Sequence, residues 1–420
     1  MPDQQNSDKW GSGVRFVAAQ RGTRMVSIRA LVERAAAQFF NEYGSNHPVL
    51  REAATRVERL KLVRETVLYV VSVESVQLDP QHLAALIEET YAELFGYGLL
   101  DRLLTDDRVT TITFDGLDKV SARFGFGELE PQSRIFEEPA HMARMLERML
   151  MDADAELVDD IPYYEIGIVH EGRRLCVNLV LPPVTNTLSG YIRVHPRTPP
   201  PLDAFTASPD ALKLLTALAR SPHGILVVGE TESGKTSLLA ALARSADLGK
   251  SVAVERASEM TLPESVTRFH PQWPVGDRPF VSFGHRILEA LDLKPDTLLL
   301  DEVRADEPEA VLHLLGDVEI PRQLWAFRGA TEVKRLAPSL GMLARRAGYD
   351  QSTSDQRVIA LHRRLPFVIT ARRRQGQLKI TSIAEWQFIL GSDQPPSLVE
   401  LMTQGWEGLE PTGRQPILTL

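Results

Sequence analysis

The segment GILVVGETESGKTSLL, residues Gly224–Leu239, constrains the fold of this chain more than any other stretch. Its apolar run Ile225–Val228 predicts a short, buried parallel strand. The residues that follow fit the pattern G-x-x-x-x-G-K-[ST], and apolar residues at helical spacing come next. The fixed positions of the pattern are Gly229, Gly234, Lys235 and Thr236. A strand, a glycine loop and a helix in this order are the context of a phosphate-binding loop.

The chemistry of such a loop follows from its residue types. Glycines let backbone N–H groups turn toward phosphate oxygens, and the helix N-terminus adds partial positive charge. Lys235 is expected to reach the β- and γ-phosphates, and the Thr236 hydroxyl is expected to bind Mg²⁺. The alternative is a chance match in an ordinary loop, which the flanking strand and helix disfavour. The predicted nucleotide-binding residues of the loop are Gly229, Glu230, Thr231, Glu232, Ser233, Gly234, Lys235, Thr236 and Ser237.

Composition limits the class of protein. A chain of 420 residues has room for two or three domains with their own cores, and 43% apolar and 25% charged residues are ordinary for a globular protein. The net charge of −9 argues against a generic nucleic-acid binder. The single cysteine, Cys176, excludes an intrachain disulfide, fits a reducing cytoplasm and is expected to be a small buried side chain. No apolar run reaches the length of a membrane span, and residues 1–22 lack the apolar core of a signal peptide.

Periodicity and composition shifts divide the chain into segments. Residues 1–24 are polar and predict a disordered tail, and apolar residues at i, i+3 and i+4 over 25–94 predict a helical segment. Alternating runs over 95–196 predict an α+β domain. Three consecutive prolines in 197–208 predict an extended linker. Residues 209–420 are expected to form an α/β domain with a C-terminal extension.

Individual elements are also predicted. Strands are expected at VTTITFDG, at Val120–Phe126, at Tyr164–Val169 and Arg174–Val180 around an EGRR turn, and at Tyr191–Val194. Helices are expected at Ala140–Met151 and Pro209–Arg220.

A second acidic motif follows the phosphate-binding loop. Ser251–Glu255 is a strand candidate that ends in an acid, and the run Leu298–Leu300 is followed by Asp301 and Glu302. A carboxylate at the end of a buried strand downstream of such a loop holds Mg²⁺, and a neighbouring glutamate polarises the attacking water. The alternative is a strand end with two solvated carboxylates, which the preceding loop disfavours.

Beyond these motifs, the chain resembles the secretion ATPases of type II and type IV secretion and of tight-adherence pili, in the branch with an N-terminal helical region. The segments that carry the resemblance are Phe95–Gly116, Val158–Val184, Ser189–Pro196, Lys294–Ala310 and Ile369–Trp386. Each segment is weakly specific, but their order and spacing together are specific. The resemblance implies a RecA-like P-loop NTPase domain of the α/β class, preceded by an α+β N-terminal domain and a helical segment.

The resemblance also implies roles for single residues. Glu302 is expected to be the Walker B glutamate, and Asp301 the Mg²⁺ ligand. Glu255 and Glu259 match the first and last acids of the family's Asp box, where Glu255 is expected to orient water. Arg193 matches an arginine at the domain junction that reaches nucleotide. The implied assembly is a hexamer that binds ATP and Mg²⁺, lies in the cytoplasm at the inner face of the membrane, and drives a membrane platform partner of a secretion or pilus machine.

Two positions depart from the family. Arg256 stands where the family has an aspartate, and the histidine box is replaced by QLWAFRGA at 323–330, with Arg328 about where the histidine falls. Either Arg328 acts as a cationic γ-phosphate sensor, or the protein binds ATP and turns it over slowly. An arginine stabilises charge but does not shuttle a proton at neutral pH. The alternative is that Arg328 is a surface residue without a role in catalysis.

Three functions remain open from the sequence. The first is an ATP-hydrolysing cytoplasmic motor for pilus assembly or secretion, with Glu302, Glu255 and Arg328 as catalytic residues. The second is a hydrolysis-impaired nucleotide-binding assembly subunit, which the altered histidine box favours. The third is a DNA-translocating ATPase, for which the run Arg372–Arg374 is a weak signal because aromatic residues are not interleaved with it. No metal cluster is expected.

Overall fold

The computed structural model describes residues 16–18, 25–44, 47–133, 135–136, 138–316, 320–328, 333–348, 350–374, 377–388, 396–405 and 408–420. The predicted tail, 1–24, lies outside these residues except for β1 (Phe16–Ala18), which pairs antiparallel with β2 (Met25–Ser27). Residues 16–18 are therefore a strand and not part of a disordered tail. The prediction missed them because composition averaged over the whole segment hides a short apolar run. By contact, the chain forms two compact units. The first comprises 1–124, 128–152 and 179–191, and the second comprises 125–127, 153–178 and 192–420.

The helical segment of the first unit is a small bundle around an apolar core. The core includes Leu31, Phe39, Val67 and Leu86. Its helices begin at polar caps, such as the capping box of Thr55 and Glu58, which satisfies free backbone N–H groups. The helices are α1 (Ile28–Tyr43), α2 (Pro48–Glu52), α3 (Arg56–Val73), α4 (Pro80–Phe95), η2 (Gly98–Leu100) and α5 (Asp101–Leu104). This confirms the predicted helical region.

The next part of the chain forms a six-stranded sheet in the order β5-β4-β3-β8-β7-β6. Alternation explains β8, in which every second residue is buried, whereas in β3 the alternation is broken at Thr111 and Ile112, next to an irregularity in the pairing with β4. The elements are β3 (Val109–Asp115), β4 (Lys119–Phe124), β5 (Leu129–Pro131), α6 (Pro139–Asp152), β6 (Tyr163–His170), β7 (Arg173–Val180) and β8 (Ser189–Val194). The predicted strands and the predicted helix are confirmed within two residues at most ends.

The second unit is built on a nine-stranded sheet in the order β11-β10-β12-β13-β9-β14-β15-β16-β17. The first six strands are parallel and the last three run antiparallel to their neighbours. The strands are β9 (Ile225–Gly229), β10 (Ser251–Val254), β11 (Thr267–Phe269), β12 (Thr297–Arg304), β13 (Arg322–Arg328), β14 (Phe367–Arg374), β15 (Gln377–Gln387), β16 (Ser397–Gln404) and β17 (Leu409–Pro411). Because β13 lies between β9 and β12, the carboxyl ends of these three strands meet at one edge of the sheet.

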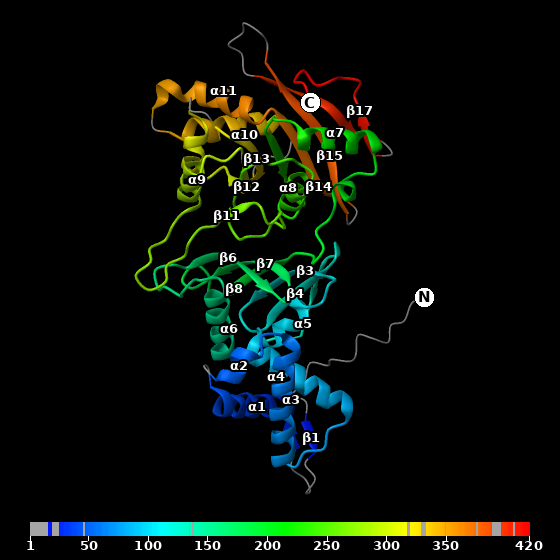
Figure 1. Cartoon of the computed structure of the whole chain (residues 1–420), viewed down its shortest axis with the longest axis vertical. Coiled ribbons are helices and arrows are strands. Elements are labelled where there is room, and N and C mark those ends of the chain that lie inside the picture. Colours follow the sequence, from blue (N-terminus) through cyan, green and yellow to red (C-terminus); the bar gives the residue numbers. More distant parts are fainter. Residues whose placement is uncertain are drawn as a thin grey trace. The chain divides into compact units, whose positions relative to one another are not determined.

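Helices cover both faces of this sheet (Figure 1). The apolar run of β9 alternates between the two cores, since Ile225 and Val227 belong to one and Leu226 and Val228 to the other. The first core includes residues of α7 and α8, and the second includes residues of α9, α10 and α11. The helices are η3 (Leu202–Phe205), α7 (Pro209–Arg220), α8 (Lys235–Arg244), α9 (Phe283–Asp292), η4 (Pro308–Leu314), α10 (Val333–Arg346), η5 (Gln351–Thr353) and α11 (Ser354–Arg364). The predicted α/β class is confirmed.

Among the described residues, no helix combines the length and the apolar character that a membrane span requires.

Candidate functional site

The loop between β9 and α8 has the backbone that its glycines permit. Gly234 has φ 83°, in the left-handed region, and directly precedes α8. A Cβ on Gly229 would come 2.4 Å from the backbone carbonyl oxygen of Ala371, and one on Gly234 would come 2.7 Å from Leu378 Cδ1 at a φ that side chains rarely adopt. Both positions therefore require glycine. The loop forms the strand-to-helix turn predicted from the sequence.

Lys235 starts α8 with its ammonium group turned back into the loop. Its Nζ donates a hydrogen bond to the carbonyl of Glu230 at 2.8 Å, and the residue is 6% exposed. Burial lowers the pKa of Lys235 to about 8, although the nearby Glu302 acts in the opposite direction. The two acids of the loop should repel a bound phosphate only weakly. Glu230 is exposed to solvent, and Glu232 lies 3.4 Å from the cation Arg373. The loop therefore presents a buried cation at the start of a helix.

Asp301 lies in β12 with its carboxylate fully enclosed. Its Oδ2 accepts from the backbone N–H of Arg256 at 2.8 Å, and its Oδ1 has no hydrogen-bond partner among the residues that the structure describes. Burial raises the pKa of Asp301 well above its usual value, and the neighbouring acid Glu255 adds to this shift. A buried carboxylate oxygen without a partner fits a hard divalent cation such as Mg²⁺. Asp301 and Thr236 are the residues that would hold it.

Glu302, the next residue, lies among cations. Its Oε1 accepts from Arg304 Nε at 2.7 Å and is 3.6 Å from Arg328 Nη1. Burial alone would raise the pKa of Glu302, but the surrounding cations, Arg304 foremost, together outweigh it and the pKa is lowered. Arg328 occurs at the end of β13, directly opposite Arg304 in the strand register, and 55% of its side chain is exposed. The structure thus brings Arg328 to Glu302, at the edge where β9 and β12 also end.

The carboxylate of Glu255 is buried and does not face solvent. It is 0% exposed, its Oε1 accepts from the backbone N–H of Met260 at 2.8 Å, and its Oε2 accepts from Arg268 Nε at 2.7 Å. Burial raises the pKa of Glu255 and Arg268 only partly opposes this. Both oxygens are therefore engaged inside the protein. Sequence spacing could not show this, because Arg268 reaches Glu255 only through the parallel pairing of β10 and β11.

Arg193 forms an ion pair with Glu259 and donates to Cys176 Sγ at 3.1 Å. His195, which the sequence reasoning missed, has its Nε2 3.0 Å from the other oxygen of Glu259. Burial would raise the pKa of Glu259, but Arg193 and His195 hold it well below its usual range. Cys176 is fully buried, as predicted. The signal for His195 was the alternation Arg-x-His, which puts both side chains on one face of an extended segment.

Arg256, for which the sequence resemblance predicts an aspartate, joins three segments around the site. Its Nε donates to the carbonyl of Glu302 at 2.8 Å, and its two terminal nitrogens donate to the carboxylate of Glu307 at 3.1 and 2.8 Å. Its guanidinium also stacks 4.3 Å from the ring centroid of Phe283. One arginine therefore joins the loop after β10, the end of β12, and α9.

This geometry predicts that replacing Arg256 with aspartate is harmful. Arg256→Asp leaves the Glu302 carbonyl without its donor and sets a carboxylate facing Glu307. We expect the free energy of unfolding to fall by about 3 kcal/mol. This value is at the lower end of the range for breaking a buried ion pair, because Glu307 is partly exposed. Urea unfolding at neutral pH measures it.

The matched control for this variant is Arg278→Asp. It breaks the solvent-exposed pair of Arg278 with Asp154 and should change the free energy of unfolding much less than Arg256→Asp does. Equal losses in the two variants would contradict this role of Arg256.

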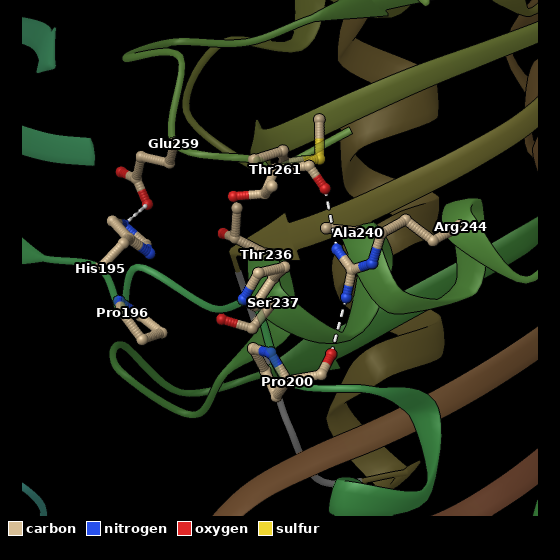
Figure 2. Close-up of a pocket in the computed structure, with 11 residues that line it drawn as sticks. His195, Pro196, Pro200, Thr236, Ser237, Ala240, Arg244, Glu259 and Thr261 are labelled. Atoms are coloured by element: carbon tan, nitrogen blue, oxygen red, sulfur yellow. Dashed lines mark hydrogen bonds and ion pairs between the residues drawn. The ribbon is translucent and has the colours of Figure 1, made fainter. Parts of the chain in front are cut away.

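A small pocket lies beside the first turn of α8 (Figure 2). Arg244 closes one side by donating to the carbonyls of Thr261 at 2.8 Å and Pro200 at 2.6 Å, which fastens the proline-rich segment to α8. The lining residues are His195, Pro196, Pro199, Pro200, Thr236, Ser237, Ala240, Arg244, Glu259, Met260 and Thr261. The pocket thus adjoins the predicted nucleotide residues Thr236 and Ser237.

The arginine run at the end of β14 is partly engaged within the protein. Arg373 donates to the backbone carbonyls of Phe126 and Gly127, and its guanidinium lies 5.5 Å from the Phe126 ring. It also approaches Glu232 of the loop. These contacts favour a structural role for Arg373 over contact with nucleic acid.

No protein-family profile matches the sequence, and no curated protein sequence matches it. Among solved structures, the fold is similar to the VirB11 ATPase from the Brucella suis type IV secretion system in complex with sulphate, at 18% identity over 68% of this chain and 95% of that chain, with a TM-score of 0.34. It is also similar to the pilus retraction motor PilT with bound ADP, at 15% identity over 68% and 80% of the two chains, with a TM-score of 0.46. The Legionella pneumophila ATPase DotB shares 16% identity over 70% and 81%, with a TM-score of 0.46. Because these TM-scores are low, function has to be argued from the residues of the site.

Proposed function

We propose that this chain is a Mg²⁺-dependent ATPase that drives a pilus or secretion machine. The observation that carries the proposal is the meeting of two motifs at one edge of a parallel sheet. Lys235 and Thr236 begin the helix after β9, and Asp301 and Glu302 lie near the end of β12. Asp301 Oδ1, buried without a partner among the described residues, is the atom that such a site requires for a cation.

The proposed reaction is attack of water on the γ-phosphorus of ATP. The new bond joins the water oxygen to phosphorus, the bond to the β,γ-bridging oxygen breaks, and ADP and phosphate leave, with the two protons of the water carried away on the phosphate. Glu302 accepts a hydrogen bond from the water and orients it, while Lys235 and Arg328 offset the negative charge that develops on phosphate and the leaving group. Bound Mg²⁺ would neutralise charge on the β- and γ-phosphate oxygens.

The assembly part of the proposal rests on the sequence resemblance across five separated segments. On this basis we propose a hexameric ring in the cytoplasm, held at the membrane through a platform partner. The five segments occur in the same order as in that family and extend well beyond the phosphate-binding loop. The loop alone is less specific, because many nucleotide-binding proteins share it.

The test of the proposal is steady-state ATP turnover of the purified protein with and without Mg²⁺. Turnover that depends on Mg²⁺ supports the ATPase. Tight ATP binding with no turnover, alone or with a membrane partner added, would leave the proposal without its enzymatic part.

A second candidate is a hydrolysis-impaired subunit whose assembly is gated by nucleotide. The specific observation in its favour is Glu255, whose two oxygens are both bonded inside the protein. If Glu255 must orient water, its ion pair with Arg268 has to break in every cycle. Oligomerisation that depends on ATP binding, in a protein without turnover, would favour this candidate.

The lowered pKa of Lys235 predicts proton uptake on nucleotide binding. Phosphate oxygens restore the pKa of this lysine toward its usual value, so at pH 8 binding should take up about half a proton, since about half of the free lysine is then neutral. Affinity should weaken above pH 8. Calorimetry in buffers of different ionisation enthalpy measures the proton count.

The control for this prediction is Lys235→Arg, which keeps a fixed charge and removes the contribution of the lysine to proton uptake. Equal uptake in the two proteins would assign the proton to another group.

The lowered pKa of Lys235 also makes the free energy of unfolding depend on pH. The folded pKa lies below the unfolded one, so the cost of burying charged Lys235 is full below about pH 8 and disappears as the pH rises toward 10.5.

A further inference from the structure

Arg304 bridges two buried carboxylates. Its Nε donates to Glu302 Oε1 at 2.7 Å, and its Nη2 lies 2.7 Å from both oxygens of Glu165. All three side chains are at most 13% exposed. Charge-assisted bonds in such surroundings are strong and directional. The position of Glu302 is therefore set with respect to Glu165, a residue 139 positions away in sequence.

Glu165 is itself firmly placed within the second unit. It lies in β6, and its backbone carbonyl accepts from Trp273 Nε1 at 3.0 Å. The Trp273 ring packs between Tyr164 and Phe280, with centroid separations of 4.9 and 5.2 Å. Both the main chain and the side chain of Glu165 are held, so it is a suitable anchor for Arg304.

The main chain of Glu302 is fixed by a different arginine. Arg256 donates to the Glu302 carbonyl and to Glu307, and Arg304 Nη1 lies 3.8 Å from the same Glu307. The Glu302 carbonyl is thus bonded to Arg256, whereas its carboxylate is bonded to Arg304, which is held by Glu165, and lies 3.6 Å from Arg328. Glu165 therefore acts on the carboxylate and not on the carbonyl.

We propose that Glu165 is a positioning residue for hydrolysis, which acts through Arg304 to aim the Glu302 carboxylate at the attacking water. This inference rests on the proposed ATPase function. A carboxylate that orients water must be held within a fraction of an ångström of its working position. Without Glu165, the Arg304 guanidinium swings with Glu302, and the carboxylate loses its fixed direction.

Steady-state kinetics of the full chain test the role. Glu165→Leu should lower kcat about tenfold and change KM for ATP by less than about twofold, because the phosphate-binding loop is untouched. Glu165→Gln, which keeps one acceptor oxygen, should recover part of the loss. Arg304→Met should lower kcat to a similar extent, and adding Glu165→Leu to it should produce no further fall.

The matched control is Arg278→Met, which removes an arginine from the exposed pair with Asp154 and should leave kcat unchanged. An unchanged kcat in Glu165→Leu would overturn the inference. So would a further fall when Glu165→Leu is added to Arg304→Met, because the residue would then act by another route.

A second measurement tests the Arg304 bridge by itself and separates failure of the bridge from failure of the proposed function, which absent wild-type turnover would show. Urea unfolding of Glu165→Leu, Glu302→Gln and the double variant, without nucleotide, tests whether one arginine serves both carboxylates. The double variant leaves Arg304 buried with Glu307 at 3.8 Å as its remaining acid, so its unfolding midpoint should fall by more than the sum of the single shifts. Additive shifts would overturn the shared role of Arg304.

Discussion

Lys235→Ala is expected to lower ATP turnover by about 10²–10³-fold and to weaken Mg-ATP binding by roughly 10- to 100-fold. A hydrogen bond to a charged group contributes about 1.5–3 kcal/mol, and each 1.4 kcal/mol is tenfold in affinity. The effect on kcat is larger, because a preorganised cation contributes most where charge develops, and loss of one such donor costs about 10²–10³-fold. Titration with a fluorescent ATP analogue measures binding, and phosphate release measures turnover.

The same variant should not be less stable than the wild type without nucleotide. Lys235 is 6% exposed and its charged form is disfavoured by burial, so alanine removes a cost of folding. If Lys235→Ala keeps its free energy of unfolding but loses ATP binding, the lysine serves ligand binding and not folding. Undiminished binding in a folded Lys235→Ala protein would exclude the loop as the phosphate site.

Glu302→Gln is expected to lower kcat by about 10²–10⁴-fold while ATP binding is kept. Glutamine has the shape of glutamate and still accepts from Arg304 Nε, but its neutral carbonyl is a much weaker acceptor for the attacking water. The adjacent Asp301 and Lys235 are unchanged, so the nucleotide and Mg²⁺ should still bind. Single-turnover phosphate release, beside equilibrium binding, separates the two effects.

A comparison with Glu255→Gln sharpens this prediction. Burial raises the pKa of Glu255, whereas the surrounding cations lower the pKa of Glu302, so loss of the negative charge should lower the urea midpoint more in Glu302→Gln than in Glu255→Gln. Turnover that survives Glu302→Gln and disappears in a folded Glu255→Gln protein would transfer the water-orienting role to Glu255.

Local sequence determined much of the fold. The run Ile225–Val228 and the glycines after it specify a buried strand and a strand-to-helix turn without reference to distant residues. The helix Pro209–Arg220 has the predicted bounds, because Ser208 caps its first turn and proline suits the first helical position. Asp301 and Glu302 follow an apolar run, and their place near the end of a parallel strand was predictable for the same reason.

What surrounds the site residues was decided only by the tertiary structure. The partners of Glu255, Glu259 and Glu302 are Arg268, Arg193 and Arg304, and no local pattern relates an acid to one of several arginines. The bonds of Arg304 to Glu165 span 139 residues, and the approach of Arg328 to Glu302 exists because β13 is inserted between β9 and β12. Sequence fixes backbone preferences over a few residues, whereas the charge state and direction of a buried side chain depend on whatever the fold packs against it.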